Sequence, residues 1–227
     1  MLNLIFFVIG LIAAVFINML ADYLPSSHTP LRPQWHTWGW SKRKRPLLVF
    51  IFTPLVLGSL PFFLASVVDT AVNSFHIIVL ILIIVTDLEH RLIFDAVVLP
   101  ATAVALLTSL LVTPEENSIR LAVVGAVAGY AIFFLLYWVA QLIYGPGRGA
   151  LGAGDVKLAM LMGAMLGFHR IFFALILGVF LGGFFSLVLL LSRRVTRDTA
   201  LPYGQYLALG GIVMLIWGAQ YVQQFLD

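Results

Sequence analysis

The 227-residue chain has no cysteine and few charged residues. Without cysteine it can form no disulfide, perform no thiol catalysis and build no cysteine-based zinc site. Charged residues make up 10% of the chain, against about 25% in soluble domains, and hydrophobic residues make up 62%. This composition predicts a single integral-membrane domain over residues 1–227, surrounded by lipid, with neither a separate soluble domain nor a nucleic-acid partner.

The first residues also lack the features of a cleavable signal peptide. Met1–Phe16 has no basic start, and the apolar run continues to about Leu20 without a small-residue cleavage site. We therefore expect this segment to remain in the protein as a membrane span.

Eight apolar runs are close to the roughly 20 residues that cross a bilayer. They predict an all-α, polytopic membrane bundle of about eight transmembrane helices. The sixth run is short, and only His169-Arg170 separates it from the seventh. The runs are Leu4–Leu20, Leu47–Val67, Ala71–Thr86, Ala96–Val112, Leu121–Ile143, Val156–Phe168, Ile171–Leu191 and Tyr203–Val222.

Lysine and arginine are distributed unevenly between the loops that join these runs. One set of alternate loops holds all but two of the 13 basic residues, and the other set holds only Arg120 and Arg170. Because basic loops tend to stay in the cytoplasm, the rich side is predicted to be cytoplasmic and both termini to lie outside. The main basic loop, Pro25–Pro46, contains three tryptophans, which is typical of an interfacial belt and leaves a role in substrate docking open.

Small residues recur four positions apart in three of the predicted spans. This spacing lets membrane helices approach closely, so it predicts helix packing at these places. The pairs are Gly125/Gly129, Gly163/Gly167 and Gly178/Gly182.

Two aspartates stand at the ends of apolar runs on the same predicted side. Asp87 follows the third run, and Asp155 begins the sixth. A carboxylate is costly at the edge of a membrane helix, so each is a candidate functional group. Helix packing could bring the two within a few ångströms. The sequence leaves open that each is only a solvated helix end, and an acid near a helix start is favoured by the helix dipole.

Paired carboxylates in a poorly solvated site can carry out hydrolysis. They cannot both ionise, so they share one proton. The ionised group accepts a proton from water as the water attacks a peptide carbonyl, and the protonated group donates to the carbonyl oxygen. Gly152 and Gly154 leave the backbone beside Asp155 open to an extended peptide. The preceding stretch, Gly145–Gly149, predicts a loop.

A small transporter or channel is the alternative from another functional class. Intramembrane acids also serve as cation or proton sites. Such sites usually lie near the middle of the membrane, whereas Asp87 and Asp155 fall at the ends of their runs, which favours hydrolysis.

Longer strings around both aspartates, and two further strings, occur in a recognisable order. Together they resemble the bacterial type IV prepilin peptidase family, membrane aspartic proteases with a G-x-G-D motif. The strings are Phe16-Ile17-Asn18 with Leu24-Pro25, DLEHRLIFD at Asp87–Asp95, LGAGDVKL at Leu151–Leu158 and LPYGQYLALG at Leu201–Gly210.

The resemblance implies an endopeptidase that cuts the basic leader from prepilin or pseudopilin precursors at the cytoplasmic face of the cell membrane. Asp87 and Asp155 would be its catalytic pair, and no metal would be needed. Glu89, His90 and Asp95 would lie near the site, where they either orient the substrate or are solvated helix ends. Lys157 is either a local charge partner or an interface anchor.

The chain departs from the family pattern in ways that affect cofactors. Many members carry a cysteine-rich, zinc-binding domain after the first span, whereas here that region is about Pro25–Pro46 and structural zinc is not expected. Those members also methylate the new N-terminus with S-adenosylmethionine. Asn18 and Pro25 match the family's N-terminal segment and keep this activity open, but Tyr23 replaces its arginine. Phe94 stands where proline is usual.

Overall fold

The structure is a computed structural model that describes residues 1–26, 45–64, 66–112, 118–145, 151–192 and 203–226. Within these ranges the chain forms seven α-helices and a short 3-10 helix, and no strand. The all-α prediction is confirmed. Most of the tryptophan-rich loop and of the glycine-rich stretch before Asp155 lies outside the described residues. The helices are α1 (Leu2–Ser26), α2 (Arg45–Ser59), η2 (Leu60–Phe62), α3 (Val67–His90), α4 (Asp95–Thr108), α6 (Ile119–Tyr144), α7 (Ala153–Leu191) and α8 (Gly204–Leu226).

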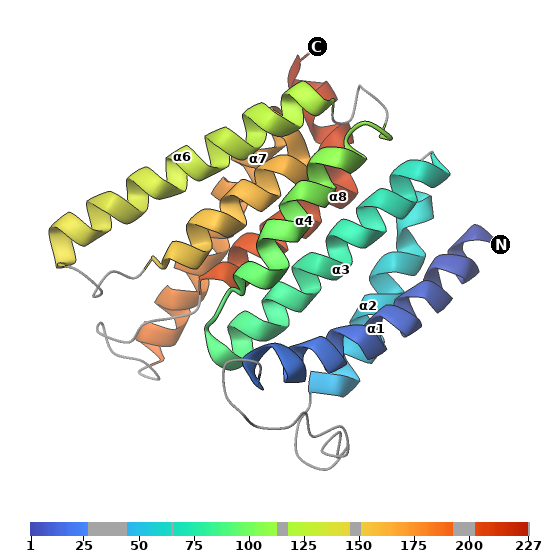
Figure 1. Cartoon of the computed structure of the whole chain (residues 1–227), viewed down its shortest axis with the longest axis horizontal. Coiled ribbons are helices and arrows are strands. Elements are labelled where there is room, and N and C mark those ends of the chain that lie inside the picture. The colour runs from blue at the N-terminus through green and yellow to red at the C-terminus, as the bar shows by residue number, and fades with distance from the viewer. Residues whose placement is uncertain (27–44, 65, 113–117, 146–150, 193–202, 227) are drawn as a thin grey trace.

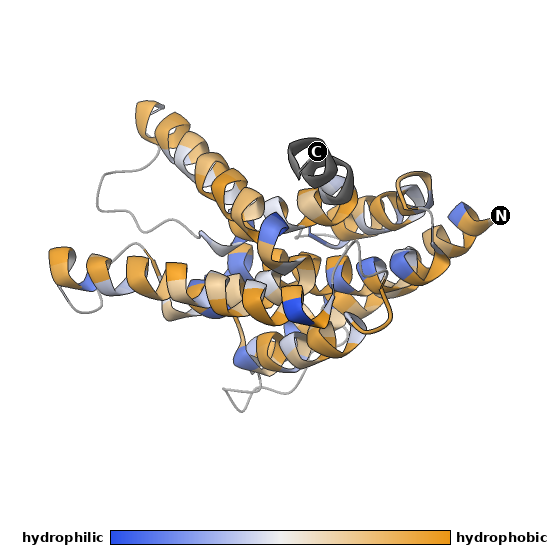
Figure 2. Ribbon diagram, turned by 90° about the horizontal axis from the view of Figure 1, so that it is seen from above, coloured by the Kyte–Doolittle hydropathy of each residue, from blue (hydrophilic) through white to orange (hydrophobic). Residues whose placement is uncertain are grey.

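The helices form because the apolar runs are long and satisfy their own backbone hydrogen bonds, as a span in lipid requires. Five helical segments in the described ranges are long and apolar enough to cross a membrane, while α4 and the apolar part of α8 are shorter. Figure 2 shows hydrophobic residues along most of every helix. The chain is therefore a membrane protein.

The predicted sixth and seventh spans form one helical element, α7, so the described helices number seven and the count of eight crossings stays a prediction. Gly167 breaks α7, with φ 76° and ψ 176°, three residues before Arg170. Glycine tolerates this positive φ because it has no Cβ. The two halves flank α8 in opposite directions. Successive neighbours of α8 show this: Asp155 at Gly204, Met162 at Gly211, Gly182 at Tyr203 and Ala174 at Gly210.

The helices pack as neighbours in a bundle (Figure 1). On one side α1 lies along α2, and on the other α6 lies along α7; α3 and α8 pack against each other between them. The main core is aliphatic and includes Leu80, Leu158 and Met162. This arrangement brings the end of α3 together with the starts of α7 and α8, which we call the dyad end of the bundle.

Glycine pairs allow the closest helix contacts, as their spacing predicts. A Cβ at Gly163 would overlap the carbonyl group of Gly125, and a Cβ at Gly129 would overlap the carbonyl of Ala159. A Cβ at Gly178 would stand 2.8 Å from the Cα of Leu207. Backbone, rather than a movable side chain, occupies each space, so α6, α7 and α8 depend on these glycines for their separation.

We expect Gly163→Ala to destabilise the protein by about 2 kcal/mol or more, because its methyl group forces α6 and α7 apart. The matched control is Gly183→Ala on the same helix, where no atom lies within 4 Å of the added Cβ. Thermal unfolding of both variants in detergent measures the difference. Equal stability of the two variants would contradict the observed α6–α7 crossing.

Candidate active site

Asp87 lies in the last turn of α3, where the helix is closed on itself. Arg91 adopts a left-handed conformation, with φ 56°, and its N–H donates to the Asp87 carbonyl at 2.9 Å. This C-terminal cap ends α3 directly after the acidic residue. The Asp87 side chain is 4% exposed, so α3 holds its carboxylate inside the protein rather than in solvent.

Asp155 lies in the first turn of α7. Gly152 precedes the helix in extended conformation, and its N–H donates to Asp155 Oδ2 at 2.9 Å. The carboxylate thereby binds back to the backbone at the start of its own helix, where negative charge is favoured. Asp155 is 7% exposed. Both aspartates are therefore buried, which argues against the solvated-end alternative.

The start of α8 joins the two aspartates. The N–H of Gln205 donates to Asp87 Oδ2 at 2.9 Å, across 118 residues of sequence. A Cβ placed on Gly204 would lie 3.2 Å from Asp87 Oδ2 and 3.3 Å from Asp155 Oδ1. Those two oxygens are therefore at most 6.5 Å apart, the sum of the two distances. We call Asp87 and Asp155 the dyad.

Sequence reasoning did not single out Gly204 and Gln205 as site residues. Gly204 begins the last apolar run, which is a signal for a helix start. A helix start offers free N–H groups to an anion, but the sequence does not say which anion it faces. Only the packing of α8 beside α3 places these N–H groups at Asp87.

The two predicted glycines next to Asp155 have different surroundings. A Cβ on Gly152 would meet only Asp155 Oδ2 at 3.5 Å and the Gly154 nitrogen at 3.9 Å. A Cβ on Gly154 would meet the Ile93 Cβ at 3.0 Å. Ile93 therefore fills the space at Gly154, and the room expected there for a peptide is taken by packing. Gly152 keeps its open side.

The charged candidates around the dyad form ion pairs with one another. Lys157 Nζ lies 2.7 Å from both carboxylate oxygens of Asp95, in a pair that is largely solvent-exposed. Of the two readings of Lys157, the structure has the local charge partner. The pair joins α4 to α7, although an exposed pair of this kind contributes at most about 1 kcal/mol.

Glu89 is paired on the other side of α3. Arg45 donates to Glu89 at 2.6 Å and to Asp22 at 2.9 Å, which ties the starts of α2 and the ends of α1 and α3 together. His90 Nε2 lies 3.8 Å from the same Glu89 oxygen. Neither Glu89 nor His90 has a hydrogen bond to the dyad among the contacts described for them, so their place is beside the site.

Asn18 and Pro25 lie on α1. Asn18 is 1% exposed, and its amide donates to the Ala14 carbonyl within the same helix at 2.8 Å. Pro25 lies in the last turn. Among the described residues no three histidine or acidic side chains gather as metal ligands. The residues that come together around a reactive centre are thus Asp87, Asp155, Gly152, Gly204 and Gln205.

The arrangement matches a known family. The model of the type IV leader peptidase family matches residues 74–187, half of the chain, and this stretch includes both aspartates. The chain belongs to the type IV leader peptidase family. Its membership confirms the resemblance carried by the sequence motifs.

Curated relatives bear the name prepilin leader peptidase/N-methyltransferase. The Aeromonas hydrophila protein is 34% identical over 148 residues, which are 65% of this chain and 50% of the relative. The Pseudomonas aeruginosa protein is 29% identical over 144 residues, 62% of this chain and 47% of the relative. The Burkholderia pseudomallei protein is 29% identical over 177 residues, 78% and 55%. The chain spans about half the length of these relatives, and no solved structure matches it significantly.

Proposed function

We propose that this chain is a membrane aspartic endopeptidase that cuts the leader from prepilin or pseudopilin precursors. The observation that carries the proposal is the dyad: two buried carboxylates, from helices far apart in sequence, whose nearest described oxygens lie within 6.5 Å. Membership in the leader peptidase family supports the same reaction. The names of the relatives supply the substrate class.

In this mechanism the dyad shares one proton and activates water. One carboxylate accepts a proton from the water that attacks the scissile carbonyl, and the other donates a proton to the carbonyl oxygen and then to the leaving amine. The N–H of Gln205 and the start of α8 stabilise negative charge on Asp87, and the N–H of Gly152 does so on Asp155. Each aspartate has one such donor, so geometry alone assigns the shared proton to neither.

The proposed location is the cell membrane, with the dyad facing the cytoplasm and both termini outside. Three of the described basic residues, Arg45, Arg91 and Lys157, lie at the starts or ends of helices at the dyad end. Arg120, from the basic-poor loops, lies at the start of α6. This division supports the predicted orientation, because basic segments tend to stay in the cytoplasm.

Methyl transfer is a separate question, since the relatives' names include it. Asn18 packs inside α1 and spends its amide on the Ala14 carbonyl, so it presents no open site to a small methyl donor. We therefore derive no step through S-adenosylmethionine from these residues. Mass spectrometry of the mature substrate's N-terminus, after cleavage with and without added S-adenosylmethionine, answers the question directly.

We expect the purified chain in detergent micelles to cleave a prepilin with a basic leader, without added metal and with a chelator present. The measurement is the release of the leader, followed by mass spectrometry of the new N-terminus. A transporter needs a membrane separating two compartments, whereas a peptidase does not. Absence of cleavage in micelles, together with ion or proton flux through proteoliposomes, would favour the transporter and refute the peptidase.

A further inference from the structure

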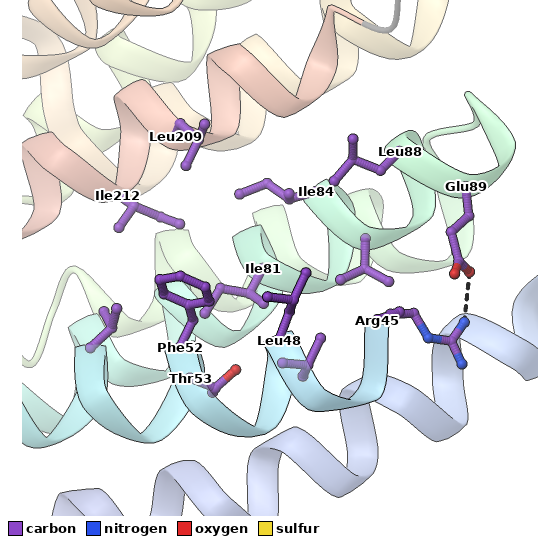
Figure 3. Close-up of a pocket in the computed structure, with 13 residues that line it drawn as sticks. Arg45, Leu48, Phe52, Thr53, Ile81, Ile84, Leu88, Glu89, Leu209 and Ile212 are labelled. Carbon is purple, nitrogen blue, oxygen red and sulfur yellow. Dashed lines mark hydrogen bonds and ion pairs between the residues drawn. The ribbon is translucent and has the colours of Figure 1, made fainter. Parts of the chain in front are cut away.

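An apolar cavity of about 500 Å³ lies between α2, α3 and α8. Figure 3 shows the side chains that line it: Leu48, Phe52 and Thr53 from α2, Ile81, Ile84 and Leu88 from α3, and Leu209 and Ile212 from α8. Arg45 and Glu89 are the only charged residues in this lining. They lie together and are joined by their ion pair. Leu48, Phe52, Leu88 and Leu209 are 40–59% exposed, so the cavity opens sideways toward lipid.

The cavity leads to the dyad along two helices. Leu88 directly follows Asp87, and Ile84 lies one turn before it on a neighbouring face of α3. On α8, Leu209 lies one turn after Gln205, whose N–H donates to Asp87. A chain segment resting in the cavity would therefore continue directly toward the two carboxylates.

The dimensions select the occupant. Arg45 and Val56 mark the extent of the lining on α2, and eleven residues of helix span about 16 Å, roughly half of the ~30 Å hydrocarbon layer. A whole helix about 10 Å wide and of this length would need more than about 1,000 Å³. The cavity therefore fits the side chains along one face of an apolar helix.

A buried hydroxyl group distinguishes a peptide from a lipid as the occupant. Thr53 is fully buried in the lining, and its Oγ1 has no hydrogen-bond partner within the part of the chain that the structure describes. A buried polar group without a partner is costly. An acyl chain offers nothing to this hydroxyl at that depth, whereas a peptide carries carbonyl groups and polar side chains.

We propose that this cavity holds one face of the substrate's own apolar membrane segment, next to the bond that the dyad cuts. The proposal rests on the proposed peptidase function and adds where the substrate binds. Apolar contacts in the cavity fix the depth and rotation of the segment, and the Arg45–Glu89 pair marks the point where it leaves the hydrocarbon layer. Recognition then depends on the membrane segment as well as on the residues around the cut.

The first test compares two substrates of the same enzyme. One is a complete prepilin in proteoliposomes, and the other is a soluble peptide that spans the cut and lacks the apolar segment. We expect Ile212→Trp, which fills the cavity, to lower the ratio of kcat/KM for the long substrate to that for the short one by about ten-fold. The matched control is Ile176→Trp, in a second apolar cavity of about 380 Å³ between α6 and α7. It should leave the ratio within two-fold.

The second test uses the absence of cysteine from the chain. Leu48→Cys or Ile212→Cys, each in an Asp87→Asn background that leaves substrate uncut, should cross-link to a prepilin with one cysteine in its apolar segment. Ile176→Cys should not. Equal cross-linking at all three sites, an unchanged ratio for Ile212→Trp, or co-purified phospholipid in place of substrate cross-links would overturn the proposal. If the wild-type chain cuts neither substrate, the peptidase function itself fails, and this proposal with it.

Discussion

Replacing Asp87 or Asp155 by asparagine is expected to lower the cleavage rate by about 10³-fold or more. Asparagine keeps the shape of the side chain but can neither accept the proton from water nor hold the shared proton. Alanine at either position should have an equal effect. The measurement is single-turnover cleavage of a prepilin in micelles, with membrane insertion and thermal stability of each variant checked alongside.

Asp69→Asn is the matched control for this prediction. Asp69 is also a buried aspartate of α3, but it lies in the first turn, 18 residues from Asp87 and so about 27 Å along the helix. We expect this variant to retain cleavage within about three-fold of wild type. Near wild-type activity in Asp87→Asn or Asp155→Asn would refute the dyad. The double variant should be no slower than either single variant, because the two carboxylates act as one unit.

The helical class and most helix positions follow from the sequence, because each apolar run must bury itself in lipid as a helix. The ends were less predictable. The helix α3 continues through Asp87 to His90, and α1 continues past its apolar run to Ser26, since polar residues continue a helix when neighbouring helices pair with them. The separation of α7 into halves was expected at His169-Arg170 but occurs at Gly167. Charge marks the surface, whereas the backbone bends where a glycine accepts positive φ.

The dyad was predictable in part. Two acids at the ends of runs on one side of the membrane point to a shared site, and packing of α3, α7 and α8 places them together. The sequence did not predict the contacts made between distant helices. Ile93 against Gly154, the Arg45 pairs and the Gln205 N–H at Asp87 each depend on how helices pack, and spacing along one chain does not encode this.

Gly204→Ala is the variant that tests the geometry of the dyad rather than its chemistry. The added methyl group would stand 3.2 Å from Asp87 Oδ2, 3.3 Å from Asp155 Oδ1 and 2.8 Å from Ile93 Cδ1. Both carboxylates would keep their charge and protons. Because the methyl group occupies space that water and the scissile carbonyl need to reach both oxygens, we expect kcat to fall by about 100-fold.

Gly211→Ala, two turns further along α8, is the control for this variant. Its added methyl group would meet the flexible ends of Leu80 and Met162 at 3.1 and 3.2 Å, far from the carboxylates. Similar thermal stability of the two variants, with loss of kcat only in Gly204→Ala, would locate the reaction at the start of α8. If Gly204→Ala cleaved at the wild-type rate, water would have to reach the dyad from the side of Gly152, whose own open face is the remaining approach to Asp155.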